Sequence, residues 1–215
     1  MKKLLSKIEI KPLFTVILLV VIQSLFYMSM KIFQGPPHLI GGLIDQKLGF
    51  CIYAIIPYCI WYLLLFIVPY YLYKNDKNIF YKYVASYLLC ILLSAFIYVI
   101  YPTTLDRPEI TQNGILYFIT KVIYWIDTPA VNCLPSMHCA LSMLFILSTF
   151  TSKKTSIIFK IIICILSISI MISTLLIKQH VLVDLITGDI LMTICYLYVN
   201  YDKKIVNKTK KLLRI

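Results

Sequence analysis

Two of the three histidines lie in short polar clusters at the edges of long apolar runs, and they are the residues best suited to chemistry. Ser136 lies just before His138, and Asp184 follows His180 after one helical turn of sequence. Ionisable groups beside membrane segments are costly to keep there, so they are functional candidates by default. Two imidazoles, a carboxylate and a hydroxyl, if brought together, could transfer a phosphoryl group.

His180 and Asp184 have the i, i+4 spacing that places two side chains on one face of a helix. A carboxylate beside an imidazole fixes the tautomer of the ring and stabilises its protonated form. The other ring nitrogen could then act as a covalent nucleophile in group transfer. The same spacing also fits a polar pair that does no more than cap the start of a membrane span.

Ser136 and His138 lie where a span is expected to begin, and a helix N-terminus is a natural phosphate site. There Ser136 could bind phosphate oxygens or simply cap the helix, and His138 could protonate a leaving group. Arg107 could bind a phosphate through two hydrogen bonds. Its alternative role is an interfacial ion pair with Asp106 or Glu109.

The composition indicates an integral membrane protein with a single all-α membrane domain over residues 1–215. Of the 215 residues, 60% are hydrophobic and only 14% are charged, whereas about 25% are charged in a typical soluble domain. Because a helix crosses a bilayer core with about 20 apolar residues, the apolar runs predict a six-helix bundle over residues 13–200. The predicted spans are Leu13–Met30, Phe50–Leu72, Phe80–Ile100, Met137–Phe150, Ile157–Ile177 and Val181–Val199.

The basic residues predict the topology in the membrane. Most of the 21 Lys and Arg residues lie in residues 1–12, residues 201–215 and alternate connections, so the positive-inside rule puts both termini in the cytoplasm. The polar clusters then meet at the outer face of a cell membrane. The net charge of +12 therefore reports topology and contact with membrane lipids, and a nucleic-acid partner is not expected.

The longest outer connection, residues 101–135, contains an amphipathic stretch that is expected to lie along the membrane interface, Ile115–Ile126. Cys133 and Cys139 flank the first polar cluster. The spacing leaves open whether they pair, because no paired framework is visible in the sequence.

Three motifs together resemble the signature of the type 2 phosphatidic acid phosphatase superfamily, over about residues 101–190. In chain order they are Arg107-Pro108, then Pro135-Ser136-x-His138, then Ser173 followed by His180-x-x-x-Asp184. Six spans also fit this family.

The resemblance implies a role for each matching residue. His180 would be the nucleophile that forms a phosphohistidine, and Asp184 would orient it. His138 would protonate the leaving group, while Arg107 and Ser136 would bind the phosphoryl oxygens. The family is metal-independent, so neither a metal nor a cofactor is expected.

The chain departs from the family pattern at the phosphate-binding positions. Ile100 stands where the family usually has a lysine, and Thr174 stands where it has an arginine. Met137 replaces a glycine. Thr174 and Met137 are still expected to lie against the phosphate by position, and Lys178, one turn beyond Thr174, is expected to replace part of the missing positive charge.

The expected function is therefore hydrolysis of a lipid phosphate at the outer membrane face. Phosphatidic acid, phosphatidylglycerol phosphate and a polyprenyl diphosphate are all suitable substrates. One alternative is a lipid head-group phosphotransferase, which would resemble sphingomyelin and inositol-phosphorylceramide synthases. Two further alternatives are a non-catalytic binder of lipid phosphate and a metal site built from two histidines and one carboxylate.

Overall fold

The computed structural model describes residues 10–213, and 76% of the chain is helical. The basic residues predicted to be cytoplasmic at positions 1–9, and residues 214–215 of the basic tail, lie outside the described part. The helices are α2 (Ile10–Phe33), α3 (Leu43–Lys47), α4 (Ile55–Asn75), α5 (Lys77–Ile100), α6 (Ile115–Ile126), α7 (Met137–Thr151), α8 (Ile157–Leu176), α9 (Leu182–Tyr201) and α10 (Lys203–Leu213). A 3-10 turn, η1 (Ile52–Ala54), precedes α4, and the two short strands are β1 (His38–Leu39) and β2 (Thr103–Thr104).

Each of the six segments predicted to span the membrane forms a helix. The largest difference is at the second segment, where the α-helix begins at Ile55 instead of Phe50 because the 3-10 turn comes first. Among residues 10–213, five helical segments are long and apolar enough to cross a membrane: α2, η1 with α4, α5, α8 and α9. The chain is thus a multi-pass membrane protein. The fourth predicted span, α7, has 15 residues, fewer than the roughly 20 that cross a bilayer core.

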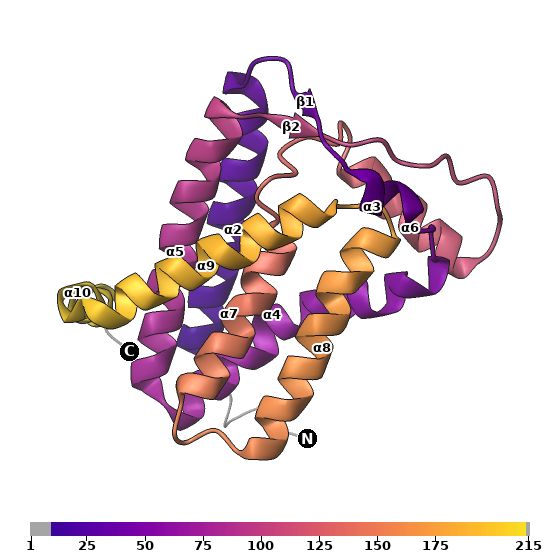
Figure 1. The fold of residues 1–215 in the computed structure, drawn as a ribbon. Coiled ribbons are helices and arrows are strands. Elements are labelled where there is room, and N and C mark those ends of the chain that lie inside the picture. The colour runs from indigo at the N-terminus through magenta and orange to yellow at the C-terminus, as the bar shows by residue number, and fades with distance from the viewer. Residues whose placement is uncertain (1–9, 214–215) are drawn as a thin grey trace.

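Helix α7 is short but lies at the centre of the bundle, where α4, α5, α8 and α9 pack around it (Figure 1). Its side chains Leu141, Leu144 and Phe145 are completely buried. The helix begins at the predicted place because the Ser136 hydroxyl accepts a hydrogen bond from the main-chain N–H of Cys139. This cap satisfies one of the free N–H groups of the first turn. It also fixes the start of α7, whose second residue is His138.

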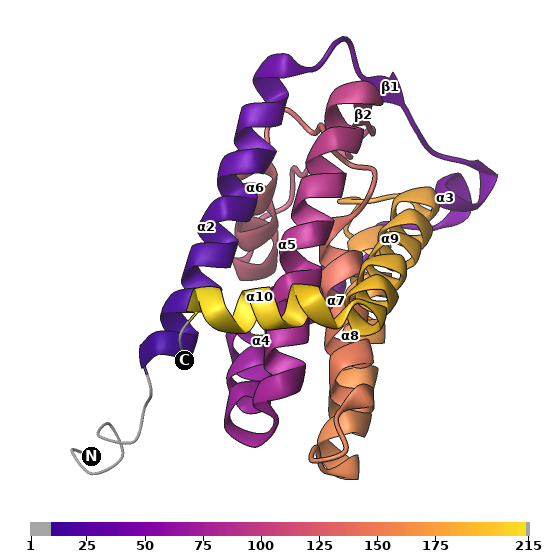
Figure 2. The same ribbon diagram turned by 90° about the vertical axis from the view of Figure 1, so that its left-hand side faces the viewer.

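The connections at one end of the bundle are tied together by short backbone contacts. β1 pairs with β2 in parallel, and Thr104 also bridges to Val131. Figure 2 shows β1, β2 and α3 gathered at this end, while α10 lies across the bundle far from them. All the elements that carry the predicted site residues thus meet at the same end.

Helix α6 confirms the predicted amphipathic stretch as a helix with the same bounds. Its inner side chains Leu116, Ile119 and Ile123 pack against a small apolar cluster that contains Tyr58 and Ile177. Its other side leaves apolar residues exposed, including Phe118 and Trp125. Helix α6 thus covers this apolar cluster and leaves its own outer side exposed.

Candidate active site

His180 lies in the tight turn between α8 and α9, and this turn is held by several hydrogen bonds. The Thr174 carbonyl oxygen accepts bonds from the N–H groups of Gln179 at 2.9 Å and His180 at 3.1 Å. Lys178 takes up a left-handed conformation with φ of 55°, which lets the chain reverse direction. At the other side of the turn, the Leu182 N–H donates to the Asp45 carboxylate at 2.8 Å.

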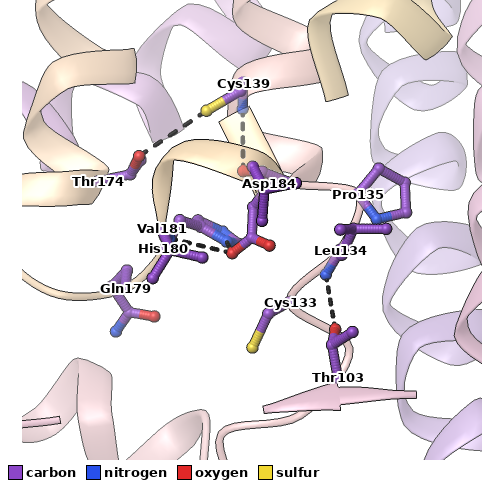
Figure 3. A network of polar contacts seen from close by, with 12 residues as sticks. Thr103, Cys133, Leu134, Pro135, Cys139, Thr174, Gln179, His180, Val181 and Asp184 are labelled. Carbon is purple, nitrogen blue, oxygen red and sulfur yellow. Dashed lines mark hydrogen bonds and ion pairs between the residues drawn. The ribbon is translucent and has the colours of Figure 1, made fainter. Parts of the chain in front are cut away.

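Asp184 fixes the imidazole of His180, as the sequence spacing predicts. Its Oδ2 lies 3.1 Å from His180 Nδ1 and also accepts a bond from the Val181 N–H at 3.1 Å (Figure 3). Asp184 is completely buried, and its Oδ1 has no hydrogen-bond partner among residues 10–213. Because a carboxylate only accepts, it holds the proton on Nδ1 and leaves the Nε2 lone pair of His180 free.

His138 faces the same space as His180. The two ring centroids are 5.6 Å apart, with an angle of 58° between the planes. Two aromatic rings of α4 hold His138 in place: Trp61 at 4.3 Å and Tyr58 at 4.8 Å between centroids. The buried Nε2 of His138 has no partner within the described residues. Both residues line one cavity, so a single group bound there could contact both imidazoles.

Arg107 lies beside this pair and forms an ion pair with Asp127. Arg107 therefore forms an ion pair, with Asp127 as its partner in place of the predicted Asp106 or Glu109. Arg107 also donates to Gln179 Oε1 at 2.8 Å, and its guanidinium lies over the Tyr124 ring at 4.9 Å. These contacts aim the positive charge at the turn that carries His180.

A cavity of about 260 Å³ joins the two histidines to the interior of the bundle. At its polar end it is lined by His138, His180, Gln179 and Asp127, and Tyr27 donates a hydrogen bond to Asp127. The rest of its wall is mainly apolar and aromatic and comes from several helices, including Val20, Met28, Leu65, Ile123 and Ile126. The chemistry of this wall suits a molecule with a polar head and an apolar body.

Cys133 also lines the cavity and is not a suitable nucleophile. Burial raises the pKa of its thiol, and the nearby Asp184 carboxylate raises it further. The reactive form of cysteine is the thiolate, and the raised pKa disfavours this form of Cys133. Cys133 and Cys139 do not pair, and all seven cysteines, which lie within the described residues, are free.

Three further residues predicted to bind phosphate, Met137, Ser136 and Thr174, lie in different surroundings. Met137 lines the cavity, and its sulfur accepts a bond from Ser94 at 3.3 Å. Ser136 is buried and caps α7. The Thr174 hydroxyl donates to the Met171 carbonyl. Contact of these residues with phosphate stays a prediction.

Lys178 donates to the carbonyl oxygens of Asp45 at 2.9 Å and Leu48 at 2.5 Å, the residues inside and just after α3. It therefore fastens α3 to the turn that carries His180. Its predicted contact with phosphate would require these two bonds to break.

Sequence reasoning did not identify Asp127, Gln179, Tyr58 or Trp61 as parts of the site. Gln179 directly precedes His180, and that adjacency was the one local signal for it. Asp127 follows the amphipathic stretch, and only the fold of the connection over residues 101–135 brings it to Arg107. Within residues 10–213, no group of three His, Cys, Asp or Glu side chains is arranged to hold a metal ion.

Comparison with known proteins identifies the family of this chain. The family model of the PAP2 superfamily matches residues 23–198, a range that contains all the predicted site residues. No curated protein and no solved structure matches the chain. PAP2 proteins are generally phosphatases. The match covers most of the chain, and the protein is therefore a member of the PAP2 superfamily.

Proposed function

We propose that this protein is a membrane phosphatase that moves the phosphoryl group of a lipid phosphate to water through His180. Membership of the PAP2 superfamily suggests phosphatase or phosphotransferase activity on phosphate esters. The observation that carries the proposal is the apposition of two imidazoles 5.6 Å apart, one of them oriented by a buried carboxylate.

In the first step, His180 Nε2 forms a bond to phosphorus while the bond from phosphorus to the lipid oxygen breaks. His138, protonated at the start, gives its proton to that oxygen, and the leaving group departs as the lipid alcohol, or as polyprenyl phosphate when the substrate is a diphosphate. Asp184 accepts the Nδ1–H hydrogen bond and stabilises the positive charge that develops on His180. Arg107 stabilises charge on the phosphoryl oxygens.

In the second step, neutral His138 takes a proton from water, and the water oxygen attacks phosphorus. The bond between phosphorus and His180 Nε2 breaks, so His180 returns to its starting state and inorganic phosphate leaves. His138 is again protonated. The sum of the two steps is hydrolysis of one phosphate ester by one water molecule.

A lipid is the proposed substrate because the cavity at the two histidines continues between the helices along a mainly apolar wall. Phosphatidic acid, phosphatidylglycerol phosphate and a polyprenyl diphosphate each combine a phosphate with an apolar body. We further propose six membrane crossings, with α7 as the short central one, both termini in the cytoplasm and the site at the outer face. The positive-inside distribution of Lys and Arg supports this orientation.

The test is a panel of the three lipid phosphates, reconstituted with the full chain in nanodiscs and assayed for phosphate release in EDTA. We expect release from at least one lipid in EDTA and no release by His180→Ala. His38→Ala is the matched control, because His38 is exposed and stacks on Tyr101 outside the cavity. Full activity of His180→Ala, or binding of all three lipids without turnover, would contradict the proposal.

A lipid phosphotransferase is the second candidate, and a second cavity favours it. This cavity, of about 520 Å³, also has His180 in its lining, together with the polar residues Asp45, Gln46 and Lys178. An acceptor alcohol larger than water would need such a space. A transferase would move labelled phosphoryl or head group into a second lipid without release of free phosphate.

A further inference from the structure

Gln179 has a buried amide group that the proposed reaction does not yet use. Its side chain lines the cavity beside His138 and His180, and the residue is only 3% exposed. Its Oε1 accepts a hydrogen bond from Arg107 at 2.8 Å, while its Nε2 has no partner among residues 10–213. Buried amide groups are nearly always hydrogen-bonded, so this nitrogen is expected to have a partner in the working protein.

The orientation of the amide follows from the chemistry of Arg107. A guanidinium has only donors, so the atom of Gln179 that faces it must be the oxygen. The NH₂ group must then point away from Arg107, and flipping the amide would set two donors against each other. The free donor is therefore fixed in place by the ion pair that Arg107 makes with Asp127.

The groups around Gln179 indicate what kind of partner fits. The ring nitrogen Nε2 of His138, which lines the same cavity, is a second donor without a partner in the described part of the chain when that imidazole is protonated. A ligand that satisfies several donors at once must be rich in acceptors, and a phosphoryl group has such oxygens. The neutral amide of Gln179 would donate a hydrogen bond to such a group without changing the net charge of the site.

We infer that Gln179 is a substrate-binding residue whose side-chain NH₂ donates to a phosphoryl oxygen held between His138 and His180. Its Oε1 at the same time keeps Arg107 beside the site. The inference rests on the proposed function, because it assigns a further ligand to the same phosphoryl group.

Gln179→Glu is the sharpest variant, because it keeps the shape and the acceptor for Arg107 but removes the NH₂ donor. If Gln179 only held Arg107, a carboxylate would hold it at least as well. We expect instead that kcat/KM falls by about 100-fold and that the inhibition constant of orthovanadate rises by a similar factor, since a charge-assisted hydrogen bond is lost and a negative charge is added. Gln179→Met, which removes both the donor and the acceptor for Arg107 without adding charge, should give about a tenfold loss.

Gln112→Glu is the matched control, because Gln112 is exposed in the outer connection, and it should leave both constants unchanged. Vanadate binding to the full chain in nanodiscs, measured without substrate, separates this inference from the proposed function. If the wild type binds vanadate, Gln179→Glu does not, and no lipid is hydrolysed, the phosphate contact stands and the proposed function fails. If Gln179→Glu and Gln179→Met bind vanadate as the wild type does, or the wild type does not bind it, the inference is overturned.

Discussion

The main-chain N–H of Ser136 donates a hydrogen bond to the carbonyl oxygen of Asp184 at 3.1 Å. This bond joins the start of α7 directly to the first turn of α9. His138 lies two residues after Ser136, and His180 lies four residues before Asp184. The bond therefore holds the two histidines at a fixed separation. The distance between the imidazoles thus depends on backbone contact between two helices as well as on side-chain packing.

Gly188 makes this contact possible, one turn further along α9. A Cβ at that position would lie 2.4 Å from the Ser136 carbonyl oxygen and 3.3 Å from the Ala140 nitrogen, both of them backbone atoms. We expect Gly188→Ala to destabilise the protein by about 1–3 kcal/mol. It should also lower turnover on the order of 100-fold, because a displacement of about 1 Å at a reacting group can have that effect. Turnover and thermal unfolding in nanodiscs measure the two effects.

Gly49→Ala is the control for this prediction, because a Cβ at Gly49 would meet nothing within 4 Å among the described residues. Wild-type turnover in Gly188→Ala would show that the close approach of α9 to α7 does not set the geometry of the site.

If Arg107 binds phosphate as proposed, Asp127 competes with phosphate for its positive charge. It pairs with Arg107, accepts a hydrogen bond from Tyr27 and lines the cavity itself. Asp127→Asn keeps an acceptor for both partners but removes the negative charge. We expect vanadate to bind about tenfold more tightly, which corresponds to about 1.4 kcal/mol. The inhibition constant of vanadate measures this effect, with the exposed Glu109→Gln as a control. Weaker binding would mean that the ion pair serves to position Arg107.

Lys178 is expected to act through the loop it holds. Its two bonds to the carbonyl oxygens around α3 involve a charged donor, and such bonds contribute about 1.5–3 kcal/mol each. In Lys178→Met we expect faster amide hydrogen exchange in residues 43–48, together with reduced turnover. The exposed Lys47→Met, in α3 itself, should change neither. If vanadate affinity falls while exchange in residues 43–48 stays at the wild-type rate, Lys178 is a phosphate ligand instead.

The helices could be predicted from the sequence because their determinants are local. Apolar runs of sufficient length set the six helical segments, and Ser136 marks the start of α7 through a bond to the third residue after it. The pairing of His180 with Asp184 follows from one helical turn. The 3-10 turn before α4 was missed because an apolar run does not distinguish it from the helix that follows.

The surroundings of Arg107 could not be predicted, because its partners are distant in sequence. Asp127 and Gln179 lie 20 and 72 positions away from it. Their positions depend on the fold of the connection over residues 101–135 and on the turn after α8, which no periodicity in the sequence encodes. The nearby Asp106 and Glu109 were the natural expectation from sequence distance alone.

The most direct test of the account is to trap the phosphorylated enzyme. The full chain in nanodiscs is mixed with a ³²P-labelled lipid phosphate that it hydrolyses, stopped within one turnover and digested, and the labelled peptide is identified by mass spectrometry. We predict an acid-labile phosphoryl group on His180 in the wild type and no labelled peptide in His180→Ala. Hydrolysis that proceeds while His180 carries no label, or a label on another residue, would contradict the account.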